Sequence, residues 1–380
     1  MGSRVSRIAF DAVALTSRPS GAGRVLKSLL ASLSEVDPQR KYVALVTAAG
    51  AEAVAAVAPS VELALVASRR GIAWELHGLG RTAQLCDADA VFTIRELVGY
   101  GGPPVVMHLF EPPAYRLRAR RARTSADLKR LGKDALMQAA LGGSIRRAAA
   151  VTAGSVSTAA WLHGRYGIHA PVVLPGVDPI FLATPTDQAI EAGAPYFLHL
   201  ATGDGRENTE LALRGFALAA CPGVRLLIAG GLVGAARSRI EAVIAELGVA
   251  DRVELLGWVP DERLRGLYSG ALAFLHPSKY EAFVGLPVLE AMALGTPVVA
   301  LAAPGVTVEV AGAALLIDRE EPALVASALE RLRQEPALRA ELAAMGRELI
   351  QPLSWTGAAR SLAAVFDTVL GVTAGPAADG

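Results

Sequence analysis

Residues 275–300, LHPSKYEAFVGLPVLEAMALGTPVVA, are the most informative stretch of this 380-residue chain. Two acids, Glu281 and Glu290, flank a tight apolar loop that contains Gly285, and a short helix and a Val-rich strand follow. A glycine loop that opens a helix presents unpaired backbone N–H groups and the positive end of the helix dipole, where a phosphate can bind. Each flanking carboxylate can accept hydrogen bonds from two sugar hydroxyls. The pattern therefore predicts a site for a nucleotide sugar.

The same stretch resembles the donor-site signature of the retaining, GT-B-fold glycosyltransferases of family 4. The matching residues are Pro277, Ser278, Glu281 and Phe283 on one side, and Gly285, Leu286, Pro287, Glu290, Ala291 and Met292 on the other. One residue, Val284, is extra relative to the family spacing. The resemblance implies that Glu290 holds the ribose. It also implies that Glu281 and the backbone of Phe283, Val284, Gly285 and Leu286 hold the sugar. The alternative is an ordinary βα-turn whose apolar residues only pack.

Length and composition favour a two-domain, well-packed enzyme. A chain of 380 residues is longer than one core usually supports, and 52% of the residues are hydrophobic. The two cysteines, Cys86 and Cys221, are far apart and have no metal-binding or redox spacing, which fits a reducing, cytoplasmic setting. Arg4 and Arg7 are followed by Asp11, which interrupts the apolar run, so no signal peptide is expected.

Short apolar runs alternate with helical patterns along the chain, which predicts parallel sheets covered on both faces. The expected strands are 5–10, 42–46, 90–92, 104–108, 149–152, 196–200, 224–229, 252–255, 272–275 and 297–300, and expected helices include 209–220 and 237–247. Residues 298–317 read as strand, turn, strand, and residues 173–186, which are punctuated by Pro and Gly, read as a linker. The fold class expected is α/β. The family resemblance implies the GT-B arrangement, with two doubly wound Rossmann-like domains facing across a cleft.

The expected domains follow from this division. An acceptor-side domain spans 1–178, a nucleotide-sugar donor domain spans 187–353, and residues 372–380 form a flexible tail. Ser354 and Trp355 begin an amphipathic helix over 354–370. In the family, the matching helix crosses back to the first domain.

Two features of the first domain are candidate contacts. A Gly-rich turn at residues 20–24 opens a helix, and its Gly23 and Arg24 resemble the family loop that approaches the donor diphosphate or the acceptor. A tight turn without a ligand is the simpler interpretation of that segment. His108 lies at the end of an expected strand, and the family places a histidine there near the transferred sugar. A packing role is the alternative for His108.

In the second domain, Arg206-Glu207-Asn208 follows the first expected strand, where the family places Arg-Lys-Asn. The resemblance implies that Arg206 clamps the departing diphosphate, with Lys279 and Arg24 as possible replacements. A carboxylate at Glu207 would repel that diphosphate by roughly 4 kcal/mol for unit charges ~4 Å apart at an effective dielectric near 20. Glu207→Lys is therefore expected to keep or raise activity.

The turn at Trp258 and Val259 resembles the family segment whose backbone cups the nucleobase. Because backbone groups make these contacts, the identity of the base leaves little trace in the sequence.

Charge is divided unevenly between the halves of the chain. Through Asp178 there are 22 Lys and Arg against 13 Asp and Glu, whereas the remainder has 15 against 23. Eight basic residues and the single acid Asp127 lie between Arg116 and Lys133. This segment is either a solvated surface or a site for an anionic or lipid-linked acceptor, with peripheral contact to the inner face of a membrane. Few aromatics interleave with the charges, which argues against nucleic acid.

The family resemblance, together with these observations, implies a retaining, metal-independent hexosyltransferase. It would move a sugar from a nucleoside diphosphate to an acceptor hydroxyl in bacterial glycan, glycolipid or natural-product synthesis. The expected catalytic residues are His108, Glu281 and Arg206. No cofactor or metal is expected, because no His/Cys cluster with the spacing of metal ligands occurs. The alternatives are a sugar-nucleotide epimerase or phosphorylase of the same fold, and a catalytically impaired subunit that binds nucleotide sugars or acts as a scaffold.

Overall fold

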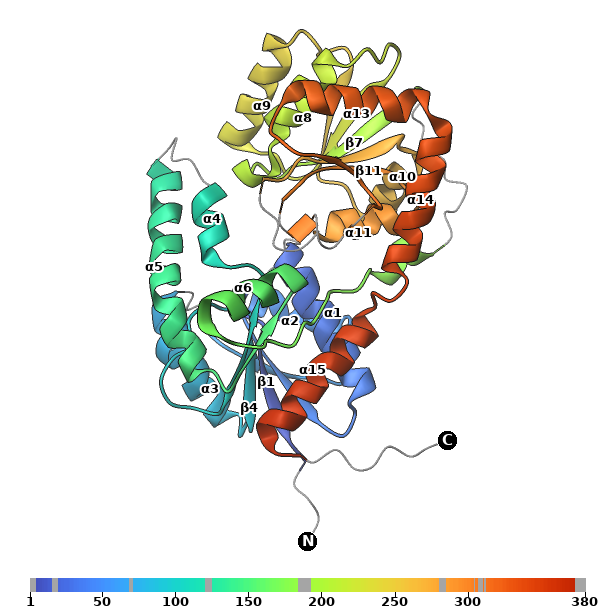
Figure 1. Ribbon diagram of the computed structural model, residues 1–380. Coiled ribbons are helices and arrows are strands. Elements are labelled where there is room, and N and C mark those ends of the chain that lie inside the picture. The colour runs from blue at the N-terminus through green and yellow to red at the C-terminus, as the bar shows by residue number, and fades with distance from the viewer. Residues whose placement is uncertain are drawn as a thin grey trace. The chain divides into compact units, whose positions relative to one another are not determined.

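The computed structural model describes residues 5–15, 20–67, 71–119, 125–183, 193–279, 285–303, 305–306, 310 and 312–372. The chain forms two compact units. Unit one comprises residues 1–118, 122–176 and 353–380, and unit two comprises residues 119–121 and 177–352. Figure 1 shows that each unit is built around its own sheet, with helices on both faces.

Unit one contains a six-stranded parallel sheet in the order β3-β2-β1-β4-β5-β6. Its strands are β1 (Arg7–Asp11), β2 (Lys41–Val46), β3 (Glu62–Leu65), β4 (Ala90–Thr93), β5 (Val105–Leu109) and β6 (Ala150–Ala153). Its helices are α1 (Gly21–Val36), α2 (Ala48–Ala55), the π-helix η1 (Trp74–Gly78), α3 (Leu79–Leu85), α4 (Pro113–Ala119), α5 (Ser125–Arg147), α6 (Val156–Tyr166) and α15 (Trp355–Leu370).

Unit two repeats this design with the strand order β12-β11-β10-β7-β8-β9. Its strands are β7 (Tyr196–Leu200), β8 (Arg225–Ala229), β9 (Val253–Gly257), β10 (Ala273–His276), β11 (Val298–Leu301) and β12 (Leu315–Ile317). Its helices are α7 (Pro179–Leu182), the 3-10 helix η2 (Gly205–Glu207), α8 (Thr209–Leu218), α9 (Gly234–Glu246), α10 (Asp261–Gly270), α11 (Leu286–Ala293), α13 (Pro322–Gln334) and α14 (Pro336–Ile350).

Both sheets have the doubly wound order in which the first and fourth strands are neighbours. In unit one these strands are β1 and β4, and in unit two they are β7 and β10. The connections after these two strands run to opposite sides of the sheet, so their loops leave a crevice where ligands of open α/β sheets bind. The α/β prediction is confirmed. The ten expected strands are all present, β12 is the second strand of residues 298–317, and the structure adds the edge strand β3.

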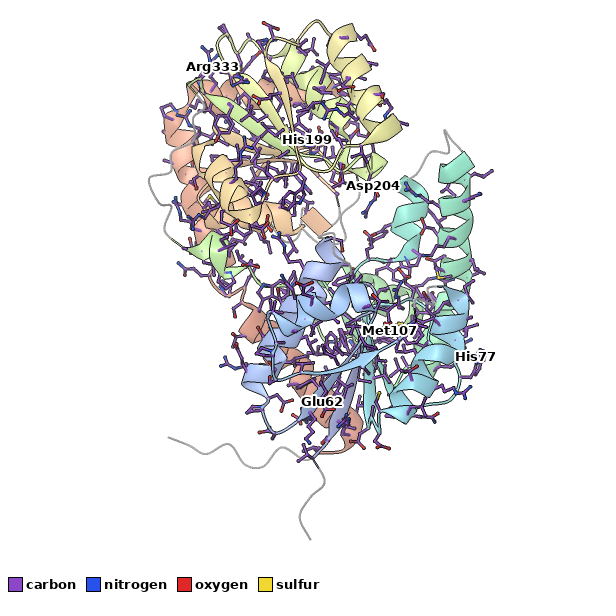
Figure 2. All side chains as sticks on the ribbon, turned by 180° about the vertical axis from the view of Figure 1, so that it is seen from behind. Glu62, His77, Met107, His199, Asp204 and Arg333 are labelled. Carbon is purple, nitrogen blue, oxygen red and sulfur yellow. The ribbon has the colours of Figure 1, made fainter. Side chains whose placement is uncertain are left out.

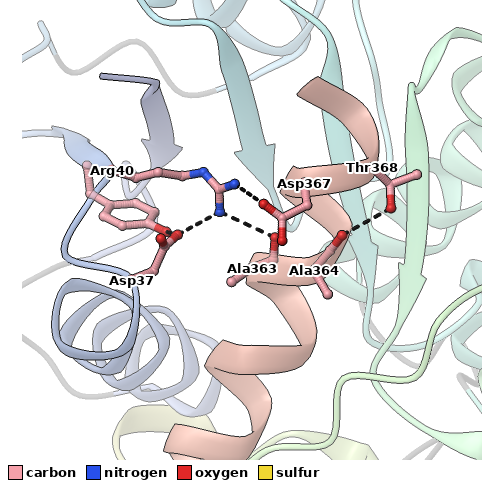
Figure 3. A network of polar contacts seen from close by, with 7 residues as sticks. Asp37, Arg40, Ala363, Ala364, Asp367 and Thr368 are labelled. Carbon is pink, nitrogen blue, oxygen red and sulfur yellow. Dashed lines mark hydrogen bonds and ion pairs between the residues drawn. The ribbon is translucent and has the colours of Figure 1, made fainter. Parts of the chain in front are cut away.

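Helix α15 belongs to unit one although it follows unit two in the chain. Ser354 caps the helix by accepting a hydrogen bond from the backbone N–H of Gly357 at 3.0 Å. Gly176 precedes unit two in the chain and packs against Trp355, which follows it. A Cβ at position 176 would lie 2.1 Å from the backbone nitrogen of Trp355, so the close approach of these two segments requires glycine. Figure 3 shows that Arg40 joins the helix to the first sheet by binding both Asp37 and Asp367.

Candidate functional site

The loops after β7 and β10 lie together at the crevice between these two strands, which is the switch point of the second sheet. The backbone N–H of Lys279 donates to the carbonyl oxygen of Arg206 at 2.9 Å. The hydroxyl of Ser278 donates to the same oxygen at 3.2 Å. These bonds bring Arg206 and Lys279 to one place, although 72 residues separate Arg206 from Ser278 in the chain. The structure therefore brings together two of the cations that the sequence analysis assigned to the diphosphate.

Arg206 is positioned by the short helix η2. Asp204 caps this helix, because its carboxylate accepts from the backbone N–H of Arg206 at 3.0 Å, and its oxygen lies 3.5 Å from Arg206 Nε. The following Asn208 adopts the left-handed conformation (φ 55°), which asparagine tolerates better than most residues, and α8 then begins. Figure 2 marks Asp204 in this loop and His199 among the strands of unit two.

The carboxylate of Glu207 is bound to the backbone of its own loop. It accepts from the N–H of Thr202 at 2.7 Å, from the N–H of Gly203 at 3.1 Å and from the Thr202 hydroxyl at 2.5 Å. Burial raises the pKa of Glu207, although the hydrogen bonds from Thr202 and Gly203 oppose the rise. These donors hold the carboxylate within its own loop, and the repulsion of a diphosphate by Glu207 stays a prediction.

A residue that the sequence analysis missed, Glu320, pairs with Lys279. Its carboxylate lies 2.6 Å from Lys279 Nζ and also accepts from the side-chain amide of Asn208 at 3.3 Å. Glu320 therefore links both loops to the segment after β12. The sequence held no signal for this contact, because Glu320 lies far from both loops in the chain and meets them only through the fold.

Glu290 and Gly285 lie on the adjoining helix α11. Gly285 is the N-cap residue with φ 82°, a conformation that favours glycine, and Pro287 follows in the first turn. The N–H groups of Val288 and Leu289 donate to the Gly285 carbonyl oxygen at 3.1 and 3.4 Å, and Pro287 has no N–H, so the N–H of Leu286 is the donor that the first turn can offer to a ligand. Glu290 is 4% exposed, and the hydroxyl of the buried Tyr268 donates to its carboxylate at 3.2 Å. Glu281, Phe283 and Val284 lie outside the described residues.

The buried ring of His199 links the two strands and the helix at this switch point. Its Nδ1 lies 2.9 Å from the carbonyl oxygen of Leu275 and must donate to it, so the neutral ring accepts from the Thr209 hydroxyl at Nε2, 3.0 Å away. The ring thereby connects β7, β10 and α8. Burial lowers the pKa of His199 to about 4.

Trp258 and Val259 follow β9, at the far side of the same sheet edge. The Trp258 side chain is 64% exposed, whereas Val259 is buried. The strand β9 that precedes them lies two strands away from β7 in the sheet.

In unit one, Gly23 and Arg24 occupy the first turn of α1. Ser20 caps that helix by accepting from the N–H of Gly23 at 3.1 Å, so the expected helix-opening turn is present. His108 lies one residue before the end of β5 and is 2% exposed. Its Nδ1 lies 2.9 Å from the Thr152 hydroxyl, and the Phe110 ring packs edge-on against it with a centroid distance of 4.7 Å. Burial lowers the pKa of His108 to about 4, so the imidazole is neutral at pH 7.

The basic segment 116–133 is described only in part. Leu128, Lys129, Arg130 and Lys133 are on α5 with Leu128 exposed, whereas residues 120–124 lie outside the described residues. None of the described helices is long and apolar enough to cross a membrane.

Comparison with known proteins connects this geometry to a family. Residues 183–349 match the family model described as glycosyl transferases group 1. A D-inositol 3-phosphate glycosyltransferase of Acidothermus cellulolyticus is 43% identical over 123 residues, which are 31% of this chain and 27% of that protein. Another, of Thermomonospora curvata, is 33% identical over 242 residues, which are 56% of each. The matched part of the chain thus spans about a quarter to just over half of these relatives' lengths.

Solved structures show the same fold over nearly the whole chain. Sucrose-phosphate synthase from Thermosynechococcus elongatus has a TM-score of 0.80 at 20% identity, over 97% of this chain and 100% of its own. HepE of Anabaena, in complex with UDP and glucose, has a TM-score of 0.73 at 18% identity, over 96% and 100%. The GT-B fold expected from the sequence is confirmed, and residues 183–349 are similar to the group 1 glycosyltransferases.

Proposed function

We infer that this chain transfers a hexose-type sugar from a nucleoside diphosphate to an acceptor hydroxyl. The support is that residues 183–349 match the group 1 glycosyltransferases and that the chain has a GT-B fold. We propose further that transfer retains the configuration at the anomeric carbon and needs no metal. The observation that carries the proposal is the junction of the loops after β7 and β10, where the Lys279 N–H binds the Arg206 carbonyl oxygen.

This junction suits a diphosphate that leaves during the reaction. Arg206 can bind two phosphate oxygens through its fork of N–H groups, and Lys279 adds a second cation. The start of α11 contributes the backbone N–H of Leu286. Negative charge grows on the diphosphate as the sugar departs, so groups held in place beforehand stabilise the transition state more than the bound donor.

Each remaining part of the donor has its own proposed contacts. Glu290 binds the ribose hydroxyls, Glu281 and the backbone of residues 283–286 bind the sugar, and the turn at Trp258 and Val259 binds the base. No protein nucleophile is required, because an oxygen of the departing phosphate takes the proton of the acceptor hydroxyl as it attacks from the same face. His108 acts near the sugar as a neutral hydrogen-bonding group, since burial keeps its pKa near 4.

The acceptor is the least defined part of the reaction. The curated relatives are named D-inositol 3-phosphate glycosyltransferases, so a phosphorylated polyol is the first acceptor to test. A lipid-linked acceptor at the inner face of a membrane is the second, and the basic part of α5 with its exposed Leu128 supports it. The setting proposed is bacterial glycan, glycolipid or natural-product synthesis.

The test is sugar transfer by variants of the junction. UDP-, GDP- and dTDP-hexoses are screened by thermal shift, and acceptor-dependent release of the nucleoside diphosphate is then measured. Arg206→Met should lower kcat more than it changes KM, because its partner gains charge in the transition state. Arg214→Met is the matched control, since Arg214 of α8 forms an exposed ion pair with Glu246 of α9, and the change should leave both constants unchanged.

Two outcomes would change the proposed function, and a third would change the residue proposed to bind the diphosphate. Nucleotide binding without turnover for any donor would favour the impaired binding subunit. Conversion of one nucleotide sugar into its epimer without an acceptor would favour the epimerase. Unchanged kcat in Arg206→Met would transfer the role of diphosphate clamp to Lys279 or Arg24.

A further inference from the structure

The ammonium group of Lys279 is paired with an acid from a third segment of unit two. Glu320 lies between β12 and α13, and its Oε2 is 2.6 Å from Lys279 Nζ. The same oxygen accepts from the side-chain amide of Asn208 at 3.3 Å. Because β7, β10, β11 and β12 are parallel, the segments after β7, β10 and β12 all lie at the carboxyl edge of the sheet, where ligands of open α/β sheets bind. Glu320 therefore places a negative charge where the proposed function places a diphosphate.

The backbone around this ion pair is fixed, whereas the Glu320 side chain is partly exposed. Gly215 of α8 lies so close to α13 that a Cβ there would be 2.4 Å from Val325 Cβ, so the two helices that follow these segments have little room to shift. The Lys279 N–H is bound to the Arg206 carbonyl oxygen at 2.9 Å. The Glu320 side chain is 48% exposed and that of Lys279 is 27% exposed. An ion pair this exposed contributes little net free energy, so a more highly charged ligand can displace the carboxylate into water.

Glu320 differs in this respect from the other acids near the junction. Asp204 and Glu207 both accept hydrogen bonds from backbone N–H groups of their own loop. Within the described residues, Glu320 instead contacts two side chains, those of Lys279 and Asn208. Its carboxylate can therefore leave Lys279 without exposing an unpaired backbone group, which would cost the full penalty of a lost hydrogen bond.

We propose that Glu320 is an exchangeable counter-ion of the donor site, which pairs with Lys279 in the free protein, releases Lys279 to the diphosphate on binding, and so lowers the affinity for the nucleoside diphosphate that must leave after transfer. This inference rests on the proposed function and adds to it a residue that sets how tightly donor and product bind.

The charge of the two nucleotides decides which of them Glu320 affects more. The terminal phosphate of a nucleoside diphosphate is a monoester, whose second ionisation has a pKa of about 6. In the nucleotide sugar that phosphate is esterified, so the product carries an additional negative charge. Competition for Lys279 and repulsion by Glu320 therefore act more strongly on the product than on the donor.

The test is calorimetry on the full chain with UDP, GDP and dTDP, followed by the hexose ester of the nucleotide that binds. Glu320→Gln removes the charge and keeps an oxygen that can accept from the Asn208 amide. This variant should bind the nucleoside diphosphate about three- to ten-fold more tightly than the wild type, and the nucleotide sugar should gain by a smaller factor. Product inhibition of turnover should rise with the affinity for the nucleoside diphosphate.

A double-mutant cycle shows whether Glu320 acts through Lys279. Lys279→Met should weaken nucleoside diphosphate binding by a larger factor in the Glu320→Gln background than in the wild type, because there Lys279 has no carboxylate to leave. Glu321→Gln is the matched control. It removes the same charge one residue away, but Glu321 pairs with Arg319 at 2.9 Å, so the affinity should stay at the wild-type value.

Three results would overturn the inference: wild-type or weaker nucleoside diphosphate binding in Glu320→Gln, an equal gain in Glu321→Gln, or additive effects of Glu320→Gln and Lys279→Met. The first of these, together with a lower melting temperature, would show that Glu320 only braces the loops. Failure of the proposed function is distinguishable, because it would appear in the wild type itself. A wild type that binds none of the three nucleotides would refute both, whereas binding without turnover would refute the proposed transfer and leave the comparison of affinities to decide the role of Glu320.

Discussion

At Glu207 a carboxylate stands where the family resemblance implies a lysine, and it accepts three hydrogen bonds from Thr202 and Gly203. Sequence reasoning identified the substitution but not the direction of the side chain, because that direction depends on the fold of the whole 201–208 loop. The three bonds give the carboxylate a structural role: it fixes the loop that presents Arg206.

Replacing Glu207 should therefore loosen that loop. Glu207→Ala leaves two backbone N–H groups without their acceptor, which costs about 1–2 kcal/mol at a partly exposed site, and donor affinity should fall by about ten-fold. Glu207→Gln keeps one acceptor oxygen and should lose less. Glu207→Lys should also weaken binding, contrary to the expectation from sequence alone. Calorimetry with the nucleoside diphosphate measures the donor-site affinity of all three variants. Wild-type affinity in Glu207→Lys would show that the loop does not need the hydrogen bonds of Glu207.

Two buried histidines predict how stability depends on pH. The folded-state pKa values of His108 and His199 are about 4, against an ordinary value of 6.5. Below pH 6.5 the unfolded chain takes up a proton on each residue, whereas the folded chain does so only near pH 4. Stability is therefore complete above pH 6.5 and falls as the pH drops toward 4, by on the order of 3 kcal/mol for each histidine.

Urea unfolding between pH 7 and pH 4.5 measures this effect. His199→Gln does not titrate, so its unfolding midpoint should fall less on acidification than that of the wild type. Exposed His77→Gln is the control and should keep the wild-type dependence. Equal pH dependence in His199→Gln and wild type would mean that His199 is already protonated in the folded chain.

At the scale of elements, the sequence predicted ten of the strands because each is a short apolar run buried between helices. It missed β3, because three of that strand's four residues are exposed, whereas residues 298–317 read as strand, turn, strand, which agrees with β11 and β12. The same limits apply to the site. The glycine loop, α11 and Arg206 could be placed from motifs, whereas the contacts of Lys279 with Arg206 and Glu320 depend on strand order and on loops far apart in the chain.

The attachment of α15 rests on a buried charge cluster. Arg40 binds Asp37 and Asp367, and the Tyr42 hydroxyl donates to Asp37 at 2.6 Å (Figure 3). Burial and the nearby Asp37 charge raise the pKa of Tyr42, so its hydroxyl stays protonated as a donor. The cluster joins the helix to the residues between α1 and β2.

Removing Arg40 should release the end of α15. Arg40→Met leaves the buried Asp37 without its cation and should cost about 3–5 kcal/mol, seen as a lower melting temperature and faster proteolysis within 355–370. Asp37→Asn/Arg40→Met should be less destabilised than the single variant, because the charge that stays unpaired, on Asp367, is partly exposed, whereas Asp37 is buried. Arg360→Met, on an exposed position of α15, is the matched control. A melting temperature in Arg40→Met equal to that of the control would show that apolar packing alone holds the helix.

At the scale of the whole molecule, two units of the same strand order each offer a switch point with its own chemistry. In unit two, the joined loops present Arg206 and Lys279 beside the start of α11. In unit one, a cavity presents Arg95, Lys133 and Glu75. The sequence predicted the first site through a family motif. It identified the basic segment that contains Lys133 but did not place Glu75 and Arg95 beside it, because these residues share no motif and meet only through the fold.

The central claim is sugar transfer with retained configuration, and the most direct measurement is the anomeric configuration of the product by ¹H NMR. The nucleotide α-hexose that stabilises the protein most is incubated with an acceptor that supports release of the nucleoside diphosphate. The account predicts an α-linked product and loss of product formation in Arg206→Met. A β-linked product, or a bound donor that yields no glycosylated acceptor at all, would contradict it.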